Sequence, residues 1–295
     1  MLPRGAAVRG VLLALLPICH AFRLIRSVGS HGSALGELNG PRHIAPLAGG
    51  GVAVVDGMNE RVQLFDAEAR AVSSIDGLVS PTGLAIAGDA LYVSESTGGH
   101  RISRYRLSDG SFLGMMGRFG MRPGELHDPQ CLTVAGELLL VAEWGNNRIS
   151  VFNRTNLAFV RHLGGDEFEV DEGDLDQPCG VAVHEGEVFV ADTWNHRISV
   201  FALDTGEFLR TFGTRGSAPG KFSYPMGITV ANGQLYVAER TGKRLQKLTL
   251  EGEPLDELAS PCGGWLYGVC VDGERVWLTG SACHAMHLLE GEAEG

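Results

Sequence analysis

Several common sequence signatures are absent from this chain. It has no Cys-x-x-Cys pair, which excludes a RING-type zinc site and a thioredoxin-like redox motif. Basic residues are scarce: there are 24 Lys and Arg against 35 Asp and Glu, and the formal net charge is −11. A nucleic-acid backbone is therefore disfavoured as the main partner, because phosphate neutralisation requires basic surface. Long amphipathic helical patterns are absent after residue 20, which argues against a helical domain.

One sequence pattern returns at near-regular intervals. The tract Val190–Phe201 reads Val-Ala-Asp-Thr-Trp-Asn-His-Arg-Ile-Ser-Val-Phe, and close copies occupy 141–152 and 54–65. Weaker copies run from Val93 and from Val237. The repeated arginines are spaced 40 to 49 residues apart and are Arg61, Arg101, Arg148, Arg197 and Arg244. A period of this length indicates a propeller or a solenoid.

Each repeat contains four short segments in which hydrophobic residues alternate with a period of two. In the fourth repeat these segments start at Gly180, Glu187, Arg197 and Glu207, and Gly, Asp or Asn turn residues separate them. Four-stranded units arranged around an axis hide their edges against their neighbours. The sequence therefore predicts an all-β fold, a six-bladed β-propeller with four strands per blade.

The sixth repeat is degenerate and stops after its third strand. Gly280 and Ala285 stand where the other repeats have their acidic residue and arginine. The missing strand is supplied at the other end of the chain, where Phe22–Gly29 reads like Phe208–Gly213. We predict that this N-terminal strand completes the last blade, because closure removes two unpaired edges.

The repeats resemble the NHL repeat, and residues 178–213 fit it almost position for position. The resemblance covers 22–290, implies one six-bladed propeller there, and leaves 291–295 as a tail. It is similar to the NHL modules of ubiquitin-ligase-type proteins, although the RING, B-box and coiled coil of a ligase are missing from this sequence. A fold of this kind hosts many functions, so the resemblance implies no single activity.

Residues 1–21 are predicted to be a leader. Arg4 and Arg9 precede an apolar run, Val11–Cys19, with the charge and length of a signal-peptide core but no Ala-x-Ala cleavage site. A frayed terminus, or a segment packed on one blade, is the competing interpretation. The run is too short to cross a bilayer, so no stable membrane span is expected. The compartment stays open, with the cytoplasm slightly favoured over secretion.

The repeated acidic residue and the arginine five or six positions later are interpreted as structural. Their recurrence in five repeats argues against an active site, because a single active site needs only one set of catalytic residues. A structural role is expected to recur, because every blade has a turn to hold in place. A carboxylate–guanidinium pair can hold such a turn in register. The six cysteines are expected to be free thiols, since Cys131 and Cys179 fall on neighbouring innermost strands that are too far apart for a relaxed disulfide.

Residues just after the repeat proline, or its equivalent, differ from blade to blade. This register, which we call the ring, should surround the mouth of the central channel, and it consists of Arg42, Thr82, Gln130, Cys179, Met226 and Tyr267. Variation around a ring suits an asymmetric ligand, but simple tolerance of drift predicts the same variation.

The resemblance also offers an enzyme alternative. Propellers similar to NHL repeats include the peptidyl-amidoglycolate lyases and, more distantly, lactonases. In the lyase pattern a histidine follows several repeat prolines, which implies a ring of imidazoles suited to zinc. The ring positions here hold no histidine; His43 lies one residue further on, and Cys131 or Cys179 would have to join it as ligands. A second alternative is RNA binding, which some NHL modules perform through a basic face.

Two features of repeats three and four suggest a binding surface. Trp144 and Trp194 fall in turns between strands, in the tracts Glu143-Trp-Gly-Asn and Thr193-Trp-Asn-His, where alternation does not demand burial. An acidic loop from Asp166 to Asp176 lies between these blades, and a solvated loop, a basic-peptide site and a calcium site are its possible roles. Exposed aromatics beside carboxylates suit a basic peptide, whereas each tryptophan can equally cover a gap between blades.

We therefore predict a monomeric, non-catalytic scaffold that recognises a protein or peptide partner, a basic one being the favoured form, in ubiquitin-ligase pathways. We predict no catalytic residue, no metal and no cofactor. The predicted binding residues are Trp144, Trp194, Asn195, His196, Asp166, Glu167, Glu169, Asp171 and Glu172. The alternative channel-mouth site comprises Arg42, His43, Gln130, Cys131, Cys179 and Tyr267.

Overall fold

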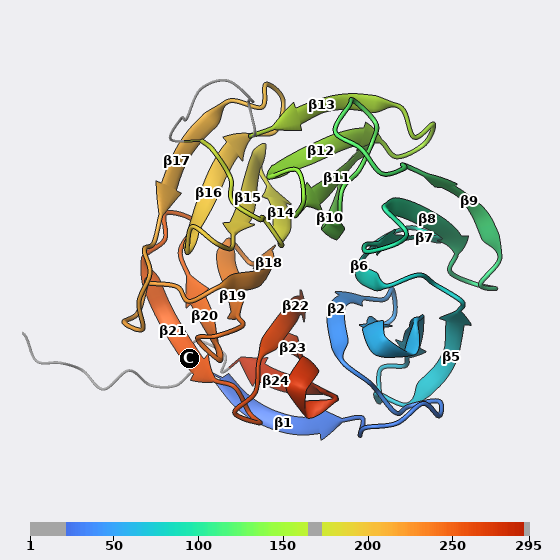
Figure 1. The fold of residues 1–295 in the computed structure, drawn as a ribbon. Coiled ribbons are helices and arrows are strands. Elements are labelled where there is room, and N and C mark those ends of the chain that lie inside the picture. The colour runs from blue at the N-terminus through green and yellow to red at the C-terminus, as the bar shows by residue number, and fades with distance from the viewer. Residues whose placement is uncertain (1–21, 165–172, 292–295) are drawn as a thin grey trace, which may run out of the picture.

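The predicted all-β propeller is confirmed. The computed structural model describes residues 22–164 and 173–291, and these form a ring of six four-stranded antiparallel sheets around a central channel (Figure 1). The predicted leader and nearly all of the predicted tail lie outside the described residues. Within the described residues no helix has the length and apolar character that a membrane span requires.

The blades follow one another in chain order. Blade one consists of β2 (Pro41–Pro46), β3 (Val52–Asp56), β4 (Arg61–Phe65) and β5 (Ala71–Asp76), and blade two of β6 (Pro81–Ala87), β7 (Ala90–Glu95), β8 (Arg101–Arg106) and β9 (Phe112–Met116). Blade three consists of β10 (Pro129–Ala135), β11 (Leu138–Glu143), β12 (Arg148–Asn153) and β13 (Phe159–Leu163). Blade four consists of β14 (Val181–His184), β15 (Glu187–Asp192), β16 (Arg197–Ala202) and β17 (Phe208–Phe212). Blade five consists of β18 (Pro225–Ala231), β19 (Gln234–Glu239), β20 (Arg244–Leu248) and β21 (Pro254–Ala259).

Blade six is closed by the N-terminal strand, as predicted. Its sheet has the order β1-β24-β23-β22, comprising β1 (Phe22–Val28), β22 (Leu266–Asp272), β23 (Arg275–Gly280) and β24 (Ala285–Gly291). The β1–β24 pairing is antiparallel and runs from Phe22 opposite Gly291 to Val28 opposite Met286. Short 3₁₀ turns, η1 (Gly57–Asn59) and η2 (Ser281–Cys283), join the second and third strands of blades one and six.

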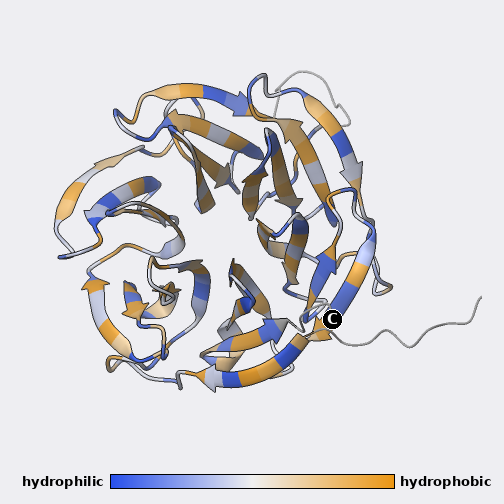
Figure 2. Cartoon of the chain, turned by 180° about the vertical axis from the view of Figure 1, so that it is seen from behind, coloured by the Kyte–Doolittle hydropathy of each residue, from blue (hydrophilic) through white to orange (hydrophobic). Residues whose placement is uncertain are grey.

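The core lies between neighbouring blades. The middle strands are buried on both faces, so that all five residues of β3 and of β4 are buried. Phe189 and Val200 of blade four, for example, pack in one cluster with Ile228 of blade five. Figure 2 shows the outermost strands alternating between hydrophobic and hydrophilic residues, because one of their faces meets solvent.

The repeated acidic residue forms a buried clamp in each of the first five blades. In blade one, Asp56 is fully buried, and its carboxylate accepts hydrogen bonds from Arg61 Nε at 2.8 Å and from the Asn39 backbone N–H at 2.6 Å. The Arg61 guanidinium in turn donates to the Ala34 and Glu37 carbonyls. The clamp therefore ties the turn between the second and third strands to the loop that precedes the innermost strand.

Equivalent clamps occur in the next four blades of the propeller. The carboxylate–arginine pairs of blades two to five are Glu95–Arg101, Glu143–Arg148, Asp192–Arg197 and Glu239–Arg244. Their carboxylates accept the backbone N–H groups of Val79, His127, Asp176 and Ser223, respectively. Each of these residues stands two positions before the repeat proline, which explains in structural terms why the acidic residue and arginine recur.

Blade six replaces the clamp with a disulfide between Cys262 and Cys283. The expectation of free thiols is wrong for this pair, whereas Cys131, Cys179 and Cys270 are free and buried. Cys262 lies in the loop before β22 and Cys283 ends η2, so the bond joins the two segments that a clamp joins elsewhere. Their Cα atoms are 6.2 Å apart, within the range that a disulfide spans. A disulfide was considered from the sequence only between Cys131 and Cys179, and the Cys262–Cys283 bond was not identified.

Removing one clamp carboxylate should destabilise the fold strongly. We expect Asp56→Ala to lower the free energy of unfolding by about 3–5 kcal/mol, because it leaves the buried Arg61 charge uncompensated. The matched control is Glu290→Ala, which breaks the exposed pair with Arg23 and should cost less than about 1 kcal/mol. Urea unfolding followed by circular dichroism measures both values, and equal losses would contradict the assigned role of the clamp.

Candidate functional site

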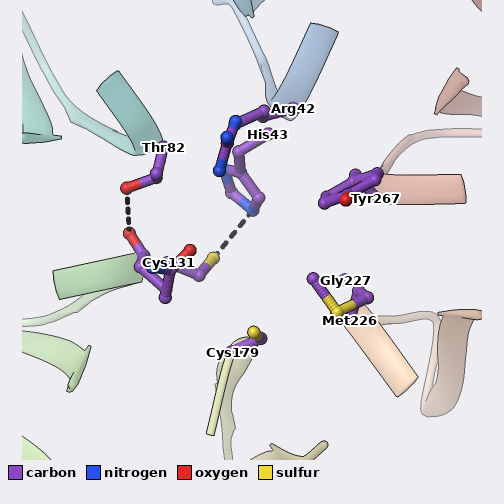
Figure 3. A pocket seen from close by; sticks show the side chains of 9 residues that line it. Arg42, His43, Thr82, Cys131, Cys179, Met226, Gly227 and Tyr267 are labelled. Carbon is purple, nitrogen blue, oxygen red and sulfur yellow. Dashed lines mark hydrogen bonds between the residues drawn. The ribbon is translucent and has the colours of Figure 1, made fainter. Parts of the chain in front are cut away.

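The six ring residues meet at one end of the channel. We call this side the mouth face; it carries the loops before the innermost strands and the turns between second and third strands. The whole ring lines a single narrow pocket together with His43, Cys131 and Gly227. Figure 3 shows side chains from different blades converging on this space. The cavity measures about 30 Å³, little more than one water molecule needs, so the ring is a constriction of the channel.

Glycines after the ring residues allow the innermost strands to approach closely. A Cβ atom on Gly180 would lie 2.3 Å from the Met226 carbonyl oxygen of the next blade, and one on Gly227 would lie 2.4 Å from that of Tyr267. No side chain fits at these distances. His43 and Cys131 occupy the same register in blades one and three, and both of their side chains reach the ring pocket.

A wider vestibule of about 230 Å³ opens outside the ring. It shares Arg42, Gln130, Met226 and Tyr267 with the ring. Its other lining residues come from the mouth-face turns and loops, and they are Ser96, Thr97, Asp128, Trp144 and Arg240. The vestibule is therefore a polar and aromatic pocket with two arginines, built from several blades.

The two vestibule arginines have unused hydrogen-bonding capacity. Among the described residues, neither Arg42 nor Arg240 forms a side-chain hydrogen bond or an ion pair. The Arg240 guanidinium lies over the Trp265 ring, 4.5 Å from its centroid, which orients the group without satisfying its N–H donors. Asp128 also lines the pocket, and its carboxylate lies 3.5 Å from His100 and 3.8 Å from His127.

His43 and Cys131 form a neutral pair inside the ring. His43 Nδ1 accepts the Leu84 backbone N–H at 3.4 Å, so the imidazole proton sits on Nε2. Nε2 lies 2.9 Å from Cys131 Sγ. Enclosure by protein lowers the pKa of His43 to about 4, although part of its surface faces the lumen. Burial raises the pKa of Cys131 to about 12. A neutral imidazole beside a neutral thiol is not an activated nucleophile.

The residues of the alternative channel-mouth site line one pocket, but they do not form the set of three metal ligands that the enzyme alternative requires. His43 and Cys131 are in contact, but they do not form a group of three potential ligands with Cys179 or another described residue. Within the described residues, three potential metal ligands gather only at Cys262, Cys283 and His287 in blade six.

The two predicted tryptophans are not equivalent. Trp144 directly follows its clamp carboxylate and lines the vestibule, whereas Trp194 stands one position later in its turn. Trp194 is 47% exposed and contacts Tyr224 edge-on, with ring centroids 5.8 Å apart. The residue that matches Trp144 in blade five is Arg240. The sequence carried a signal for it, because each of these residues directly follows the acidic residue of its clamp.

Asn195 and His196 help to hold their own loop. Asn195 donates to the Asp192 carboxylate, and His196 Nδ1, in a side chain that is almost entirely buried, accepts the Tyr224 backbone N–H at 3.1 Å. The predicted acidic binding residues Asp166, Glu167, Glu169, Asp171 and Glu172 lie outside the described residues.

Comparison with known proteins agrees with the predicted repeat. Residues 175–201 match the NHL repeat family model. A segment of 85 residues is 38% identical to the protein brain tumor of Drosophila melanogaster; it is 28% of this chain and spans only 8% of that protein. The resemblance to the NHL repeat is thereby confirmed.

Solved structures share the propeller fold. A gluconolactonase, XC5397 from Xanthomonas campestris, superposes with a TM-score of 0.69 at 18% identity, over 92% of this chain and 96% of that one. Virginiamycin B lyase from Staphylococcus aureus, solved with quinupristin, gives a TM-score of 0.64 at 16% identity, over 91% of this chain and 99% of that one. At this identity the likeness shows the fold alone.

The neutral state of His43 predicts a pH-dependent stability. Its folded pKa of about 4 lies below the ordinary 6.5, so between these values the unfolded chain binds more protons and stability falls as the pH falls. We expect the wild type to lose up to about 3 kcal/mol more than His43→Gln between pH 7 and pH 4. Urea unfolding at both pH values tests this, and parallel pH profiles would contradict it.

Proposed function

We propose that the propeller is a non-catalytic interaction scaffold that binds an anionic segment of a partner protein in the vestibule. An NHL-type propeller supports a protein-interaction role in general. The observation that supports this ligand chemistry is the presence of two arginines in one pocket beside Trp144 and Tyr267. These arginines, Arg42 and Arg240, have no side-chain hydrogen bond or ion pair with any described residue.

Guanidinium groups suit carboxylates because their planar donors match two oxygens at once. Tryptophan, tyrosine and arginine are also the side chains that contribute most to protein–protein binding energy. A peptide carboxylate lying between Arg42 and Arg240 would leave its flanking apolar side chain against Trp144 or the exposed face of Trp265. The ring below is too narrow for a side chain, so the peptide would stay in the vestibule.

The sequence-based preference for a basic partner rested on the acidic loop, most of which lies outside the described residues. It remains a prediction, as does the ubiquitin-ligase pathway. The described vestibule favours an anionic ligand, because Asp128 is its one carboxylate among the described lining residues and that group already faces two histidines.

The enzyme alternative draws less support from the channel. The likeness to a lactonase and a lyase is a likeness of fold. The His43 imidazole of the ring pocket is neutral and hydrogen-bonded to a thiol whose pKa is raised to about 12.

A phage-displayed random peptide library selected on the immobilised full chain tests the proposal. We expect selected peptides to be enriched in Asp and Glu, and Arg240→Glu and Arg42→Glu to weaken them at least about tenfold, because reversing a charge in a contact pair costs several kcal/mol. The matched control is Arg106→Glu, an exposed arginine at the opposite end of its blade, which should leave binding unchanged.

Two outcomes would overturn the proposal. Enrichment of basic peptides that tolerate Arg240→Glu would move the site to the acidic loop. Retention of polyuridine RNA on a filter, lost in the same two variants and without peptide selection, would favour the RNA alternative.

A further inference from the structure

Blade six contains a cluster of potential metal ligands where the other blades have their clamp. Cys262 Sγ, Cys283 Sγ and one imidazole nitrogen of His287 all lie within 4.8 Å of one another. They come from three segments: the loop before β22, the end of η2, and β24. His287 stands in the register that Gln63 and Gln246 occupy in blades one and five, where those amides donate to the clamp carboxylate.

The absence of a side chain at Gly280 leaves the centre of this cluster open. Gly280 stands in the position of the clamp carboxylate, and a Cβ atom built on it would lie 3.0 Å from His287 Nε2. The same atom would lie 3.2 Å from Cys283 Sγ and 3.3 Å from Cys262 Sγ. Three donor atoms of types that bind zinc therefore surround the position where the clamp side chain begins in the other blades.

His287 is oriented as a metal ligand. Its side chain is 2% exposed, and Nδ1 lies 2.8 Å from Ser27 Oγ on the closing strand β1. Nε2 is buried and has no hydrogen-bond partner among the described residues. A proton on Nδ1, donated to Ser27, would leave the Nε2 lone pair directed at the sulfurs, which is the second-shell arrangement that metal-bound histidines use.

We propose that Cys262, Cys283 and His287 form a redox-gated binding site for a zinc ion. In the oxidised chain the two sulfurs are bonded to each other. A dithiol reductant supplies two electrons and two protons, becoming a disulfide, and the Cys262–Cys283 bond gives two thiols. Zinc then binds as both thiols release their protons and His287 Nε2 donates its lone pair.

The exchange preserves the mechanical role of the disulfide. Both the disulfide and the bound metal would connect the loop before β22 to the turn at η2, and the metal would add β24 through His287. Cys262 is exposed, so a reductant can reach the bond. Thiolate and imidazole ligands favour zinc among the common divalent ions, and three protein ligands leave a fourth tetrahedral position for water.

Cobalt titration of the full chain tests the site. After reduction with a phosphine under anaerobic conditions, we expect one Co²⁺ per chain with thiolate-to-cobalt charge-transfer absorption that Zn²⁺ abolishes, and none of this in the oxidised chain. His287→Gln, a residue that this register holds in two other blades, should weaken Co²⁺ binding by more than about tenfold, since second-shell changes alone cost that much. Cys270→Ala, which removes a buried thiol elsewhere, should bind as the wild type does.

Three results would overturn the proposal. The reduced wild type could show no charge-transfer band; the band could persist at full strength in Cys283→Ser, which would locate the metal elsewhere; or His287→Gln could bind Co²⁺ as tightly as the wild type. Circular dichroism of each variant confirms that the fold is retained before binding is compared.

Discussion

The buried carboxylate–guanidinium clamp is the interaction on which the rest of this propeller depends. A fully buried acid would be costly alone, but each one accepts hydrogen bonds from an arginine and from a backbone N–H, so its charge is compensated. The backbone N–H belongs to a residue two positions before the repeat proline. The clamp therefore sets where the ring residue three positions later enters the channel, and five such clamps give the mouth a fixed geometry that its variable side chains can use.

Much of the fold was predictable because its signals are local and repeated. The period of Arg61, Arg101, Arg148 and the later arginines predicted the blades, and the match of Phe22–Gly29 to Phe208–Gly213 predicted the closure. The ring register was also found from the sequence, since the residue just after the repeat proline, or its equivalent, lines the same narrow pocket in every blade.

The sites were harder to predict because they depend on the direction in which each side chain points and on contacts between a loop and a turn that are far apart in the sequence. Trp144 and Trp194 occupy similar turns, yet a shift of one position places one in the vestibule and leaves the other half-exposed against Tyr224. Arg240 was not among the predicted site residues, although it holds the position of Trp144. The Cys262–Cys283 bond escaped because cysteines were compared at equivalent strand positions, whereas the bond joins a loop to a turn.

The closure of the ring has a kinetic consequence. Arg23 of β1 and Glu290 of β24 are ion-paired across 267 positions of sequence, whereas the other strand pairings join neighbours along the chain. During synthesis β1 leaves the ribosome before the other described strands of the six blades, and its edge stays unpaired until β24 has been made. Five blades can form in order from local contacts, but the last one requires β1 and β24 to meet across the longest sequence separation among the described strand pairings. Ring closure is thus the step at which a nascent chain is most exposed to pairing with the wrong edge.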